Sequence, residues 1–363
     1  MAADETLFRP TTIGSMELKN RIVMAPMTRS RADVHGIPAA AAATYYSQRA
    51  EAGLIISEGT QPSINGQGYP RTPGIHAPEQ VAAWRTITEA VHRQGGRIVL
   101  QIMHVGRIAH RANRVVDMAP VAPSAVRAPG EIYTDAFGKQ VHSMPRALAL
   151  EEIPSVIDEY RQATINALAA GFDGVELHGA NGYLPMQFLS SNSNRRTDQY
   201  GGSVKNRARF VIETLEAMVE VAGAGRVGLR ISPDTTFNDM HDADPAGTHL
   251  YLVQTVNRFG LAYLHVQRAP GELPPERAFD PLALLRAHFD GPIIATGGFD
   301  YRTGAQLIEQ GGADLIGYAS LFIANPDLVG RFRRGAPLAP ADTSTFYTPG
   351  EQGYIDYPVL SAV

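Results

Sequence analysis

Val175-Glu176-Leu177-His178-Gly179-Ala180-Asn181-Gly182-Tyr183 is the stretch of sequence from which the fold can be predicted. It begins as a short apolar run without polar alternation, which is typical of a parallel strand covered on both faces. The run ends at His178, and an amide, Asn181, and a phenol, Tyr183, follow closely. Two hydrogen-bonding groups and a proton donor are suited to polarising a carbonyl group and protonating the carbon beside it. The stretch contains no source of electrons, so a reduction here needs a cofactor bound elsewhere in the chain.

Similar apolar runs recur along the chain, and segments with helical periodicity lie between most of them. Alternating strands and helices predict a (β/α)8 barrel in one domain over residues 1–363. The alternative is an open doubly wound sheet, against which the missing Gly-x-Gly-x-x-Gly opening argues. The predicted strands are 22–25, 54–57, 97–102, 175–177, 227–231, 263–266, 292–295 and 315–318. The predicted helices are 38–52, 77–95, 152–171, 206–222, 250–260, 281–289 and 301–311.

Two segments interrupt the alternation. Residues 8–21 precede the first strand and are expected to form a hairpin that closes the bottom of the barrel. Residues 103–150 form a long insertion after the third strand, with an extended segment over 119–125 and a hairpin over 131–141 that turns near Gly138. Since loops of this length in compact folds are usually functional, we expect the insertion to be a lid that faces the substrate.

The composition is that of a soluble globular protein. The 363 residues are 44% hydrophobic and 19% charged, which is enough for a large core. The net charge of -4 and the lack of a long basic run argue against a nucleic-acid partner. The apolar runs are too short for a membrane span. Without cysteine, the chain has no disulfide, thiolate metal site or cysteine nucleophile. The acidic first residues lack the features of a signal peptide, so we expect a cytoplasmic protein.

The residues that follow the predicted strands indicate a cofactor site, because active sites of such barrels lie at the carboxyl ends of the strands. Thr28, Gln101 and Arg230 offer a hydroxyl, an amide and a guanidinium. Gly297 and Gly298 would let backbone N–H groups approach a phosphate closely. This set is suited to a planar, phosphorylated cofactor. Two alternatives stay open: Thr28 as a helix N-cap, and Arg230 as one partner of a buried ion pair.

Five motifs together resemble the Old Yellow Enzyme family, and the resemblance runs from about residue 7 to residue 358. The motifs are Met24-Ala25-Pro26-Met27-Thr28-Arg29, Ser143-Met144-Pro145-Arg146-Ala147-Leu148, His-x-x-Asn-Gly-Tyr at 178–183, the block from Asn194 to Arg207, and Gly353-Tyr354-Ile355-Asp356-Tyr357-Pro358. The resemblance implies an FMN-dependent ene-reductase on a (β/α)8 barrel, which oxidises NADPH or NADH and reduces the activated C=C bond of small α,β-unsaturated carbonyls or nitro-olefins. It also implies a monomer or homodimer.

The same resemblance implies which residues would hold the flavin. Thr28 would hydrogen-bond flavin O4, Gln101 would hold the pyrimidine edge, and Arg230 would face N1 and O2. Three further residues would line the isoalloxazine ring, and four would lie near the phosphate. The first group is Pro26, Met27 and Gly59, and the second is Gly297, Gly298, Ala319 and Ser320.

The resemblance also assigns the groups around the substrate. His178 and Asn181 would bind its carbonyl oxygen, the flavin N5 would deliver hydride to the β-carbon, and Tyr183 would protonate the α-carbon. Tyr69 and Tyr347 would flank the substrate. Several relatives have Trp where this chain has Met103, a difference that we expect to alter the preferred substrate shape rather than the reaction.

One departure from the family pattern concerns the cofactor phosphate. Most relatives have Gly-Arg where this chain has Ala319-Ser320, so the charge-assisted bond from that Arg is missing. We expect FMN retention to be weaker by roughly 1–3 kcal/mol unless another cation substitutes, for which Arg302 is a candidate. The departure also keeps open an alternative function, an isomerase or cyclase that acts on an enal or enone without net reduction.

Several other polar residues are expected to be structural. His104, Arg107 and His110 invite a metal interpretation, but we expect a structural or pocket-rim role and no metal. The block from Asn194 to Arg207 is interpreted as a network that fixes the loop after the fourth strand. Glu176, inside that strand, is expected to belong to a buried ion pair.

Overall fold

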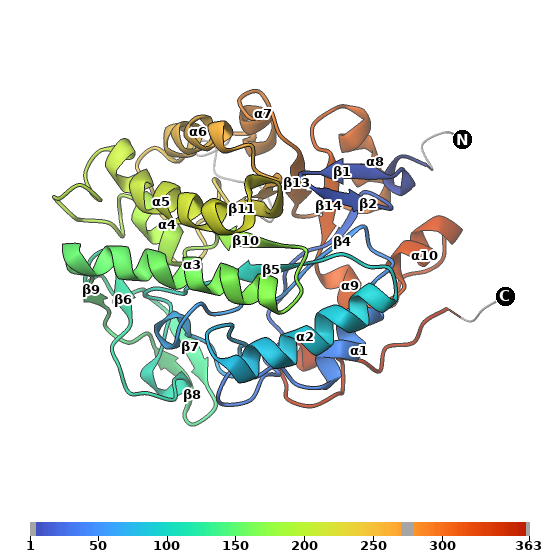
Figure 1. Ribbon diagram of the computed structural model, residues 1–363, viewed down its shortest axis with the longest axis horizontal. Coiled ribbons are helices and arrows are strands. Elements are labelled where there is room, and N and C mark those ends of the chain that lie inside the picture. The colour runs from blue at the N-terminus through green and yellow to red at the C-terminus, as the bar shows by residue number, and fades with distance from the viewer. Residues whose placement is uncertain (1–4, 270–278, 361–363) are drawn as a thin grey trace.

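A closed barrel of parallel strands forms the centre of the computed structural model, which describes residues 5–269 and 279–360 (Figure 1). The two ends of the sheet meet where β14 pairs with β3, with Ile316 opposite Ile22. The predicted (β/α)8 architecture is therefore confirmed, and every predicted strand is found with ends that shift by at most one residue. The barrel strands are β3 (Ile22–Met24), β4 (Leu54–Ile56), β5 (Ile98–Ile102), β10 (Gly174–His178), β11 (Val227–Ile231), β12 (Tyr263–Gln267), β13 (Ile293–Thr296) and β14 (Leu315–Tyr318).

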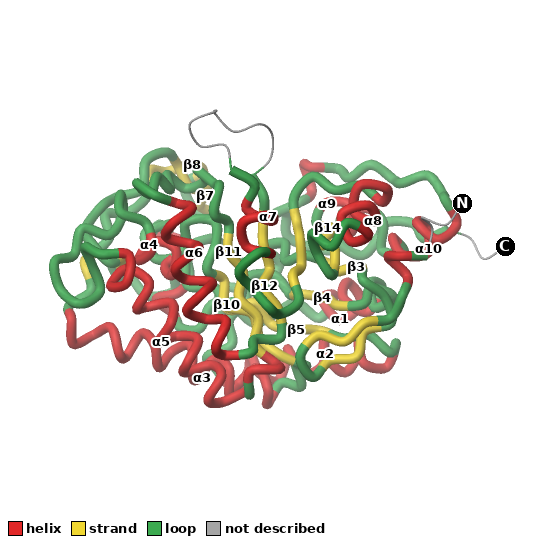
Figure 2. The backbone as a smooth tube through the Cα atoms, turned by 90° about the horizontal axis from the view of Figure 1, so that it is seen from above, coloured by secondary structure: helices red, strands yellow, loops and turns green. Residues whose placement is uncertain are grey.

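Helices surround the barrel, and α3, α5 and α6 lie next to one another on its outside (Figures 1 and 2). None of the helices in the described part of the chain is both long and apolar enough to cross a membrane. The helices are α1 (Ala41–Ser47), α2 (Pro78–Arg93), α3 (Ile153–Ala169), α4 (Leu184–Leu189), α5 (Val204–Ala222), α6 (Pro245–Val256), α7 (Pro281–Arg286), α8 (Tyr301–Glu309), α9 (Ser320–Ala324) and α10 (Leu328–Arg334).

Three helix predictions were wrong at their ends, and of these the helix predicted over 281–289 already ends at Arg286. The helix predicted over 38–52 is only α1, because after Ser47 the chain continues in tight turns such as Ala50 N–H to the Ser47 carbonyl. The helix predicted from residue 250 begins earlier, at Pro245. Asp244 caps it by accepting a hydrogen bond from the Gly247 N–H, and proline at the first helical position is a usual start signal.

The predicted N-terminal hairpin is present as β1 (Thr11–Ile13) and β2 (Met16–Leu18), paired antiparallel. Its apolar side chains Ile13, Met16 and Leu18 are buried in one cluster with residues of the barrel strands. Gly14 forms the turn with φ 53°, and a Cβ there would lie 2.1 Å from the Gly225 carbonyl oxygen. The hairpin thus closes the barrel at the end opposite the carboxyl ends of the strands.

The insertion over 103–150 contains two small sheets. Strand β6 (Val121–Ala122) pairs with β9 (Arg146–Ala147), and β7 (Glu131–Thr134) pairs with β8 (Gly138–Val141). The predicted hairpin is therefore correct, although its turn lies just before Gly138, which opens the second strand. Five apolar side chains of the insertion are buried against Tyr183, with Tyr69 packed on the same cluster. They are Met103, Val105, Ile108, Ala109 and Ala128.

The side chains of β10 alternate between the apolar core around the barrel and the polar contacts inside it. All five residues of β10 are buried. Val175 and Leu177 belong to the apolar cluster that includes the outer helices, whereas the side chain of Glu176 bonds to Gln101 of the neighbouring strand β5 and to His265 of β12. Because side chains alternate along a strand, His178 shares the inward face with Glu176 and lies at its carboxyl end.

Candidate active site

A cavity of about 310 Å³ opens at the carboxyl ends of the barrel strands. Most of the residues predicted from the sequence to bind a cofactor or a substrate line it together. These are Pro26, Met27, Thr28, Gly59, Gln101, Met103, His178, Asn181, Tyr183, Arg230, Ala319, Ser320 and Tyr347. Gly297, Gly298 and Tyr69 do not line the cavity themselves.

The turn after β10 brings His178, Asn181 and Tyr183 to the same wall. Asn181 has φ 57°, in the left-handed region that asparagine tolerates better than most residues, and Gly182 has φ 74°. After this sharp turn, Tyr183 lies at the start of α4, and its ring packs edge-on against His178 with centroids 4.9 Å apart. The local sequence therefore folds so that an imidazole, an amide and a phenol share one cavity.

His178 is held as a neutral hydrogen-bond donor. Its Nδ1 accepts the Ala180 N–H at 3.3 Å, so the ring proton resides on Nε2. Burial, together with the nearby charge of Arg230 and the neighbouring His265, holds the pKa of His178 well below its usual value. The imidazole can therefore donate one hydrogen bond to a ligand oxygen without carrying a charge.

Tyr183 is held as a protonated phenol. Burial raises its pKa well above the usual value, and the adjacent Tyr69 adds to the increase. The two phenol oxygens lie 3.2 Å apart, and burial also raises the pKa of Tyr69. Tyr69 therefore stands directly behind Tyr183 rather than in the cavity wall.

Arg230 presents an unsatisfied donor in the barrel interior. Its Nη2 donates to Oε1 of Gln267 at 2.6 Å, while its Nε is buried and has no hydrogen-bond partner among the described residues. The alternative interpretation of Arg230, a buried ion pair, is not supported, since this bond goes to an amide. A buried donor without a partner is costly, which indicates a ligand acceptor at this position.

The carboxylate of Glu176 orients Gln101 beneath the cavity. It accepts from Gln101 Nε2 at 2.7 Å and is bonded to His265 Nδ1 at 2.9 Å. Burial opposes ionisation of Glu176, but His265, followed by Arg230 and Gln101, holds its pKa below the usual value. The bond to Glu176 fixes the amide of Gln101, so that its carbonyl oxygen is left to face a ligand. The buried pairing predicted for Glu176 is confirmed.

Glycines and small residues shape the rest of the cavity. A Cβ on Gly59 would lie 2.5 Å from the sulfur of Met103, so the missing side chain makes room for Met103 to pack against this part of the wall. Gly297 and Gly298 have φ 120° and 75° and continue from β13, next to the strand that leads to Ala319 and Ser320. Thr28 is not a helix N-cap, since α1 begins only at Ala41.

Three residues that line the cavity were missed by sequence reasoning: Gln267, Ile323 and Phe346. Gln267 ends β12, and its Oε1 accepts from both Asn181 and Arg230. It is the polar residue directly after an apolar run, the same signal that identified His178. Phe346 comes from the C-terminal segment, and Arg29 and Arg31 donate to its carbonyl. No local sequence pattern predicts that contact.

The cation suggested for the phosphate, Arg302, is not among the residues that line the cavity. It lies beside Asp300 at the start of α8, on an exposed position. Ala319 and Ser320 remain the only predicted phosphate-site residues that line the cavity within the described ranges.

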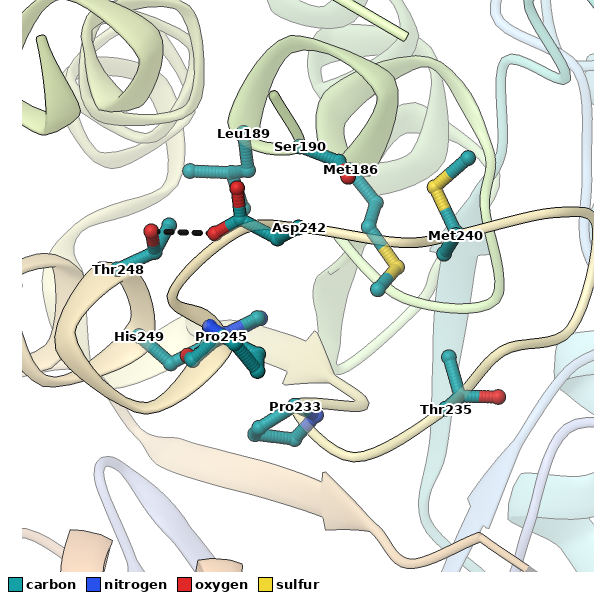
Figure 3. Close-up of a pocket in the computed structure, with 10 residues that line it drawn as sticks. All are labelled: Met186, Leu189, Ser190, Pro233, Thr235, Met240, Asp242, Pro245, Thr248 and His249. Atoms are coloured by element: carbon teal, nitrogen blue, oxygen red, sulfur yellow. Dashed lines mark hydrogen bonds between the residues drawn. The ribbon is translucent and has the colours of Figure 1, made fainter. Parts of the chain in front are cut away.

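A second cavity behind the β10 turn is too small for a substrate. It measures about 10 Å³ and lies between Met186, Met240 and His249 (Figure 3). A cavity of this size holds about one water molecule. The Nε2 of His249 is buried without a partner among the described residues, which suits such a water.

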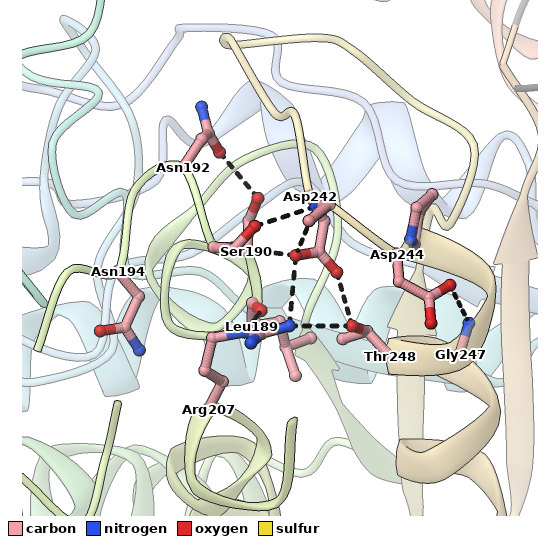
Figure 4. A network of polar contacts seen from close by, with 12 residues as sticks. Leu189, Ser190, Asn192, Asn194, Arg207, Asp242, Asp244, Gly247 and Thr248 are labelled. Carbon is pink, nitrogen blue, oxygen red and sulfur yellow. Dashed lines mark hydrogen bonds and ion pairs between the residues drawn. The ribbon is translucent and has the colours of Figure 1, made fainter. Parts of the chain in front are cut away.

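The polar block from Asn194 to Arg207 forms the structural network predicted for it (Figure 4). Arg207 Nε donates to the Leu189 carbonyl at 2.7 Å and Arg207 Nη2 pairs with Asp242 at 3.2 Å. Asn194 donates to the carbonyl groups of Phe188 and Tyr200, both at 2.7 Å. These bonds fix the segment after α4.

The residues considered for a metal have structural contacts. His104 Nδ1 accepts the Gly106 N–H, and Arg107 pairs with Asp239. His110 caps a short 3-10 turn by accepting the Ala112 N–H. Across the residues that the structure covers, there is no group of three or more His, Cys, Asp or Glu side chains placed to hold a metal ion.

Known proteins resemble this chain in sequence and in fold. The sequence profile of the NADH:flavin oxidoreductase / NADH oxidase family matches residues 6–339. The chain is 44% identical to 12-oxophytodienoate reductase 1 of Oryza sativa subsp. japonica, over 100% of this chain and 95% of that protein. It is 43% identical to a probable flavin mononucleotide-dependent alkene reductase of Leishmania infantum, over 98% of both. The structure of morphinone reductase in complex with tetrahydroNAD superposes with a TM-score of 0.92 at 45% identity, over 98% of each chain.

Proposed function

Because this chain belongs to the NADH:flavin oxidoreductase / NADH oxidase family, that of the Old Yellow Enzymes, we propose that it reduces the activated C=C bond of small α,β-unsaturated carbonyls or nitro-olefins. FMN is the cofactor, and NADPH or NADH is the reductant. The observation that carries the proposal is the shared cavity wall of His178, Asn181 and Tyr183, with the flavin-binding candidates Gln101 and Arg230 on the two strands that flank β10.

The residues of the cavity fit a bound flavin. The unpartnered Nε of Arg230 suits the electron-rich pyrimidine edge of the ring, and the fixed carbonyl of Gln101 suits its N–H. Thr28, Pro26 and Met27 would complete the floor, with Ser320 and the neighbouring backbone toward the phosphate. When bound and reduced, FMN supplies the hydride that the chain's own side chains cannot.

His178 and Asn181 would bind the substrate's carbonyl or nitro oxygen. His178 would donate through Nε2. Asn181 Nδ2 donates one of its two protons to Gln267 Oε1 at 3.1 Å, and the other proton is left to bond the substrate. Two donors on this oxygen stabilise the negative charge that develops there during reduction. The neutral imidazole adds no second positive charge beside Arg230 before the substrate enters.

Tyr183 would donate the proton to the α-carbon. Its raised pKa keeps the phenol protonated at physiological pH, so the acid is available whenever substrate is bound. Tyr69, in hydrogen-bond distance of Tyr183, would help to return a proton to it. Met103 and Tyr347 would shape the remaining space around the substrate.

The first experiment tests the redox function. Purified protein, reconstituted with FMN, should be yellow and should oxidise NADPH or NADH under anaerobic conditions. With cyclohexenone, the expected product is cyclohexanone, formed mole for mole with oxidised nicotinamide. The rival function, an isomerase or cyclase favoured by the lack of a cationic side chain at Ser320, would convert an enone without nicotinamide oxidation. That outcome, or a protein that binds no flavin, would overturn the proposal.

A further inference from the structure

Arg71 joins three segments that are distant in sequence at the rim of the cavity. Its Nε donates to the Ser30 carbonyl at 3.0 Å, in the loop after β3. Its Nη2 donates to the Tyr347 carbonyl at 2.8 Å, in the C-terminal segment. Its Nη1 forms an ion pair with Asp135, in the turn of the β7–β8 hairpin. One guanidinium therefore connects the barrel, the C-terminal segment and the insertion.

The bond to Tyr347 matters because Tyr347 belongs to the cavity wall. Its side chain is 60% exposed, so packing alone holds it weakly. Tyr183 lines the same cavity. The preceding Phe346 is anchored by Arg29 and Arg31, whereas the backbone of Tyr347 is anchored by Arg71.

The β7–β8 hairpin is bound at two points to the loop after β4, which contains Arg71. Asn113 Nδ2 donates to the carbonyls of Gly68 and Tyr133, which joins the loop after β4 to strand β7. The ion pair of Arg71 with Asp135 joins the loop to the hairpin turn. Between these two ties lies Tyr69, whose phenol contacts Tyr183.

The backbone of Arg71 is strained. Its φ of 55° lies in the left-handed region, which disfavours a residue with a side chain. Its carbonyl accepts the Ala32 N–H at 3.0 Å, which holds it in that conformation. Strain that persists next to an active site suggests that the position of the side chain is needed. Since Asp135 is half-exposed, the ion pair adds little to global stability, so its effect should be one of position.

We infer that Arg71 is a positioning residue, which holds Tyr347 in the cavity wall and ties it to the β7–β8 hairpin, and so sets how closely a small substrate is enclosed. The inference rests on the proposed function for its substrate, and on the contacts above for its geometry. If Tyr347 loses its bond to Arg71, a small cyclic enone should bind less tightly. The chemical step, which uses His178 and Tyr183, should continue at nearly the same rate.

The test compares Arg71→Ala and Asp135→Asn with a matched control, Asp117→Asn. Asp117 forms an exposed ion pair with Arg111 in the same insertion, so the control removes a similar charge away from the cavity. Hydrogen exchange of peptides 131–141 and 345–350 is measured on the FMN-reconstituted protein without substrate. Steady-state kinetics with cyclohexenone give KM and kcat separately.

In Arg71→Ala we expect faster exchange in both peptides, and in Asp135→Asn chiefly in the hairpin peptide. We expect KM for cyclohexenone to rise about fivefold in Arg71→Ala, the scale of one lost hydrogen bond, with kcat changed by less than about twofold. Unchanged exchange and KM in Arg71→Ala and Asp135→Asn would overturn the inference, as would equal changes in the control. A kcat loss that parallels a lower melting temperature would indicate a merely structural role and also overturn it. Exchange needs no turnover, so a wild-type protein inactive on enones would refute the proposed function while leaving this test intact.

Discussion

The phenol oxygens of Tyr69 and Tyr183 lie 3.2 Å apart, one from the loop after β4 and the other from the turn after β10. This pair makes Tyr183 the end of a short hydrogen-bonded chain rather than an isolated acid. Both groups are buried and both have a raised pKa, so the pair holds its protons through the neutral range.

Tyr183→Phe should therefore separate the two halves of the reaction. Reduction of the cofactor by NADPH should proceed within about twofold of wild type, whereas enone reduction should fall by about 10²-fold or more, as expected when a general acid is removed. Stopped-flow absorbance measures each half-reaction. Tyr69→Phe is the matched control and should slow only the second half, by a smaller factor. Equal slowing of both halves in Tyr183→Phe would contradict its proposed role.

Ser320→Arg should tighten FMN binding. Ser320 lines the cavity at the start of α9, and a guanidinium there would add a charge-assisted bond to the phosphate. A gain of roughly 1–3 kcal/mol corresponds to a decrease in Kd of about fivefold to 150-fold. Quenching of FMN fluorescence on titration measures Kd directly, and Ser320→Ala controls for loss of the hydroxyl. A Kd that does not change in Ser320→Arg would show that the phosphate already has its cation.

Glu58 should make stability depend on pH. Burial raises its pKa to about 7, although Arg29 and Tyr46 oppose the increase. The folded state therefore holds a proton that the unfolded state releases near pH 4.5, and stability decreases as the pH rises through that interval. Glu58→Gln should remove this loss, making the variant more stable than wild type above pH 7 by roughly 1–3 kcal/mol.

Urea unfolding of wild type and Glu58→Gln at pH 5, 6, 7 and 8 measures the difference. Subtracting the two curves removes the contribution of all other titrating groups. A difference that is constant with pH would refute the assignment to Glu58.

Gly14→Ala should destabilise the hairpin that closes the barrel. The new Cβ would lie 2.1 Å from the Gly225 carbonyl, and the residue would keep a φ of 53°. Both effects are unfavourable, so we expect a loss of roughly 2–4 kcal/mol. Gly130→Ala, in the insertion, shares the positive φ but has open space around its Cβ and isolates the conformational effect. Thermal unfolding followed by circular dichroism would register the difference, and equal melting temperatures would reject the steric argument.

Much of the barrel was predictable because a buried parallel strand has a recognisable local sequence, a short apolar run without polar alternation. Apolar runs without alternation identified all the barrel strands, and the polar residue at the end of each run located the cavity. Gln267 is also the polar residue at the end of an apolar run. It was overlooked because the predicted strand ended at residue 266, one residue before the end of β12. The helix that starts at Pro245 was also predictable from its Asp-Pro cap.

The rest depends on contacts between distant segments. Phe346 reaches the cavity because Arg29 and Arg31 bind carbonyl groups of the C-terminal segment, and backbone acceptors have no sequence signature. Arg71 shows the same limit, because its three partners come from three separate parts of the chain. The cationic partner of a phosphate near Ser320 could likewise not be assigned from spacing, and Arg302 does not line the cavity.

The cavity's floor and its rim have different origins in the chain. The floor consists of strand ends that are locked by barrel pairing, whereas the rim comes from the insertion after β5 and the C-terminal segment, which lie outside the repeating units. Changes of length or sequence in those two segments leave the register of every barrel strand untouched. Descendants of such a chain can therefore diversify in what they accept while inheriting the same redox chemistry, and a designer could exchange the rim as a module.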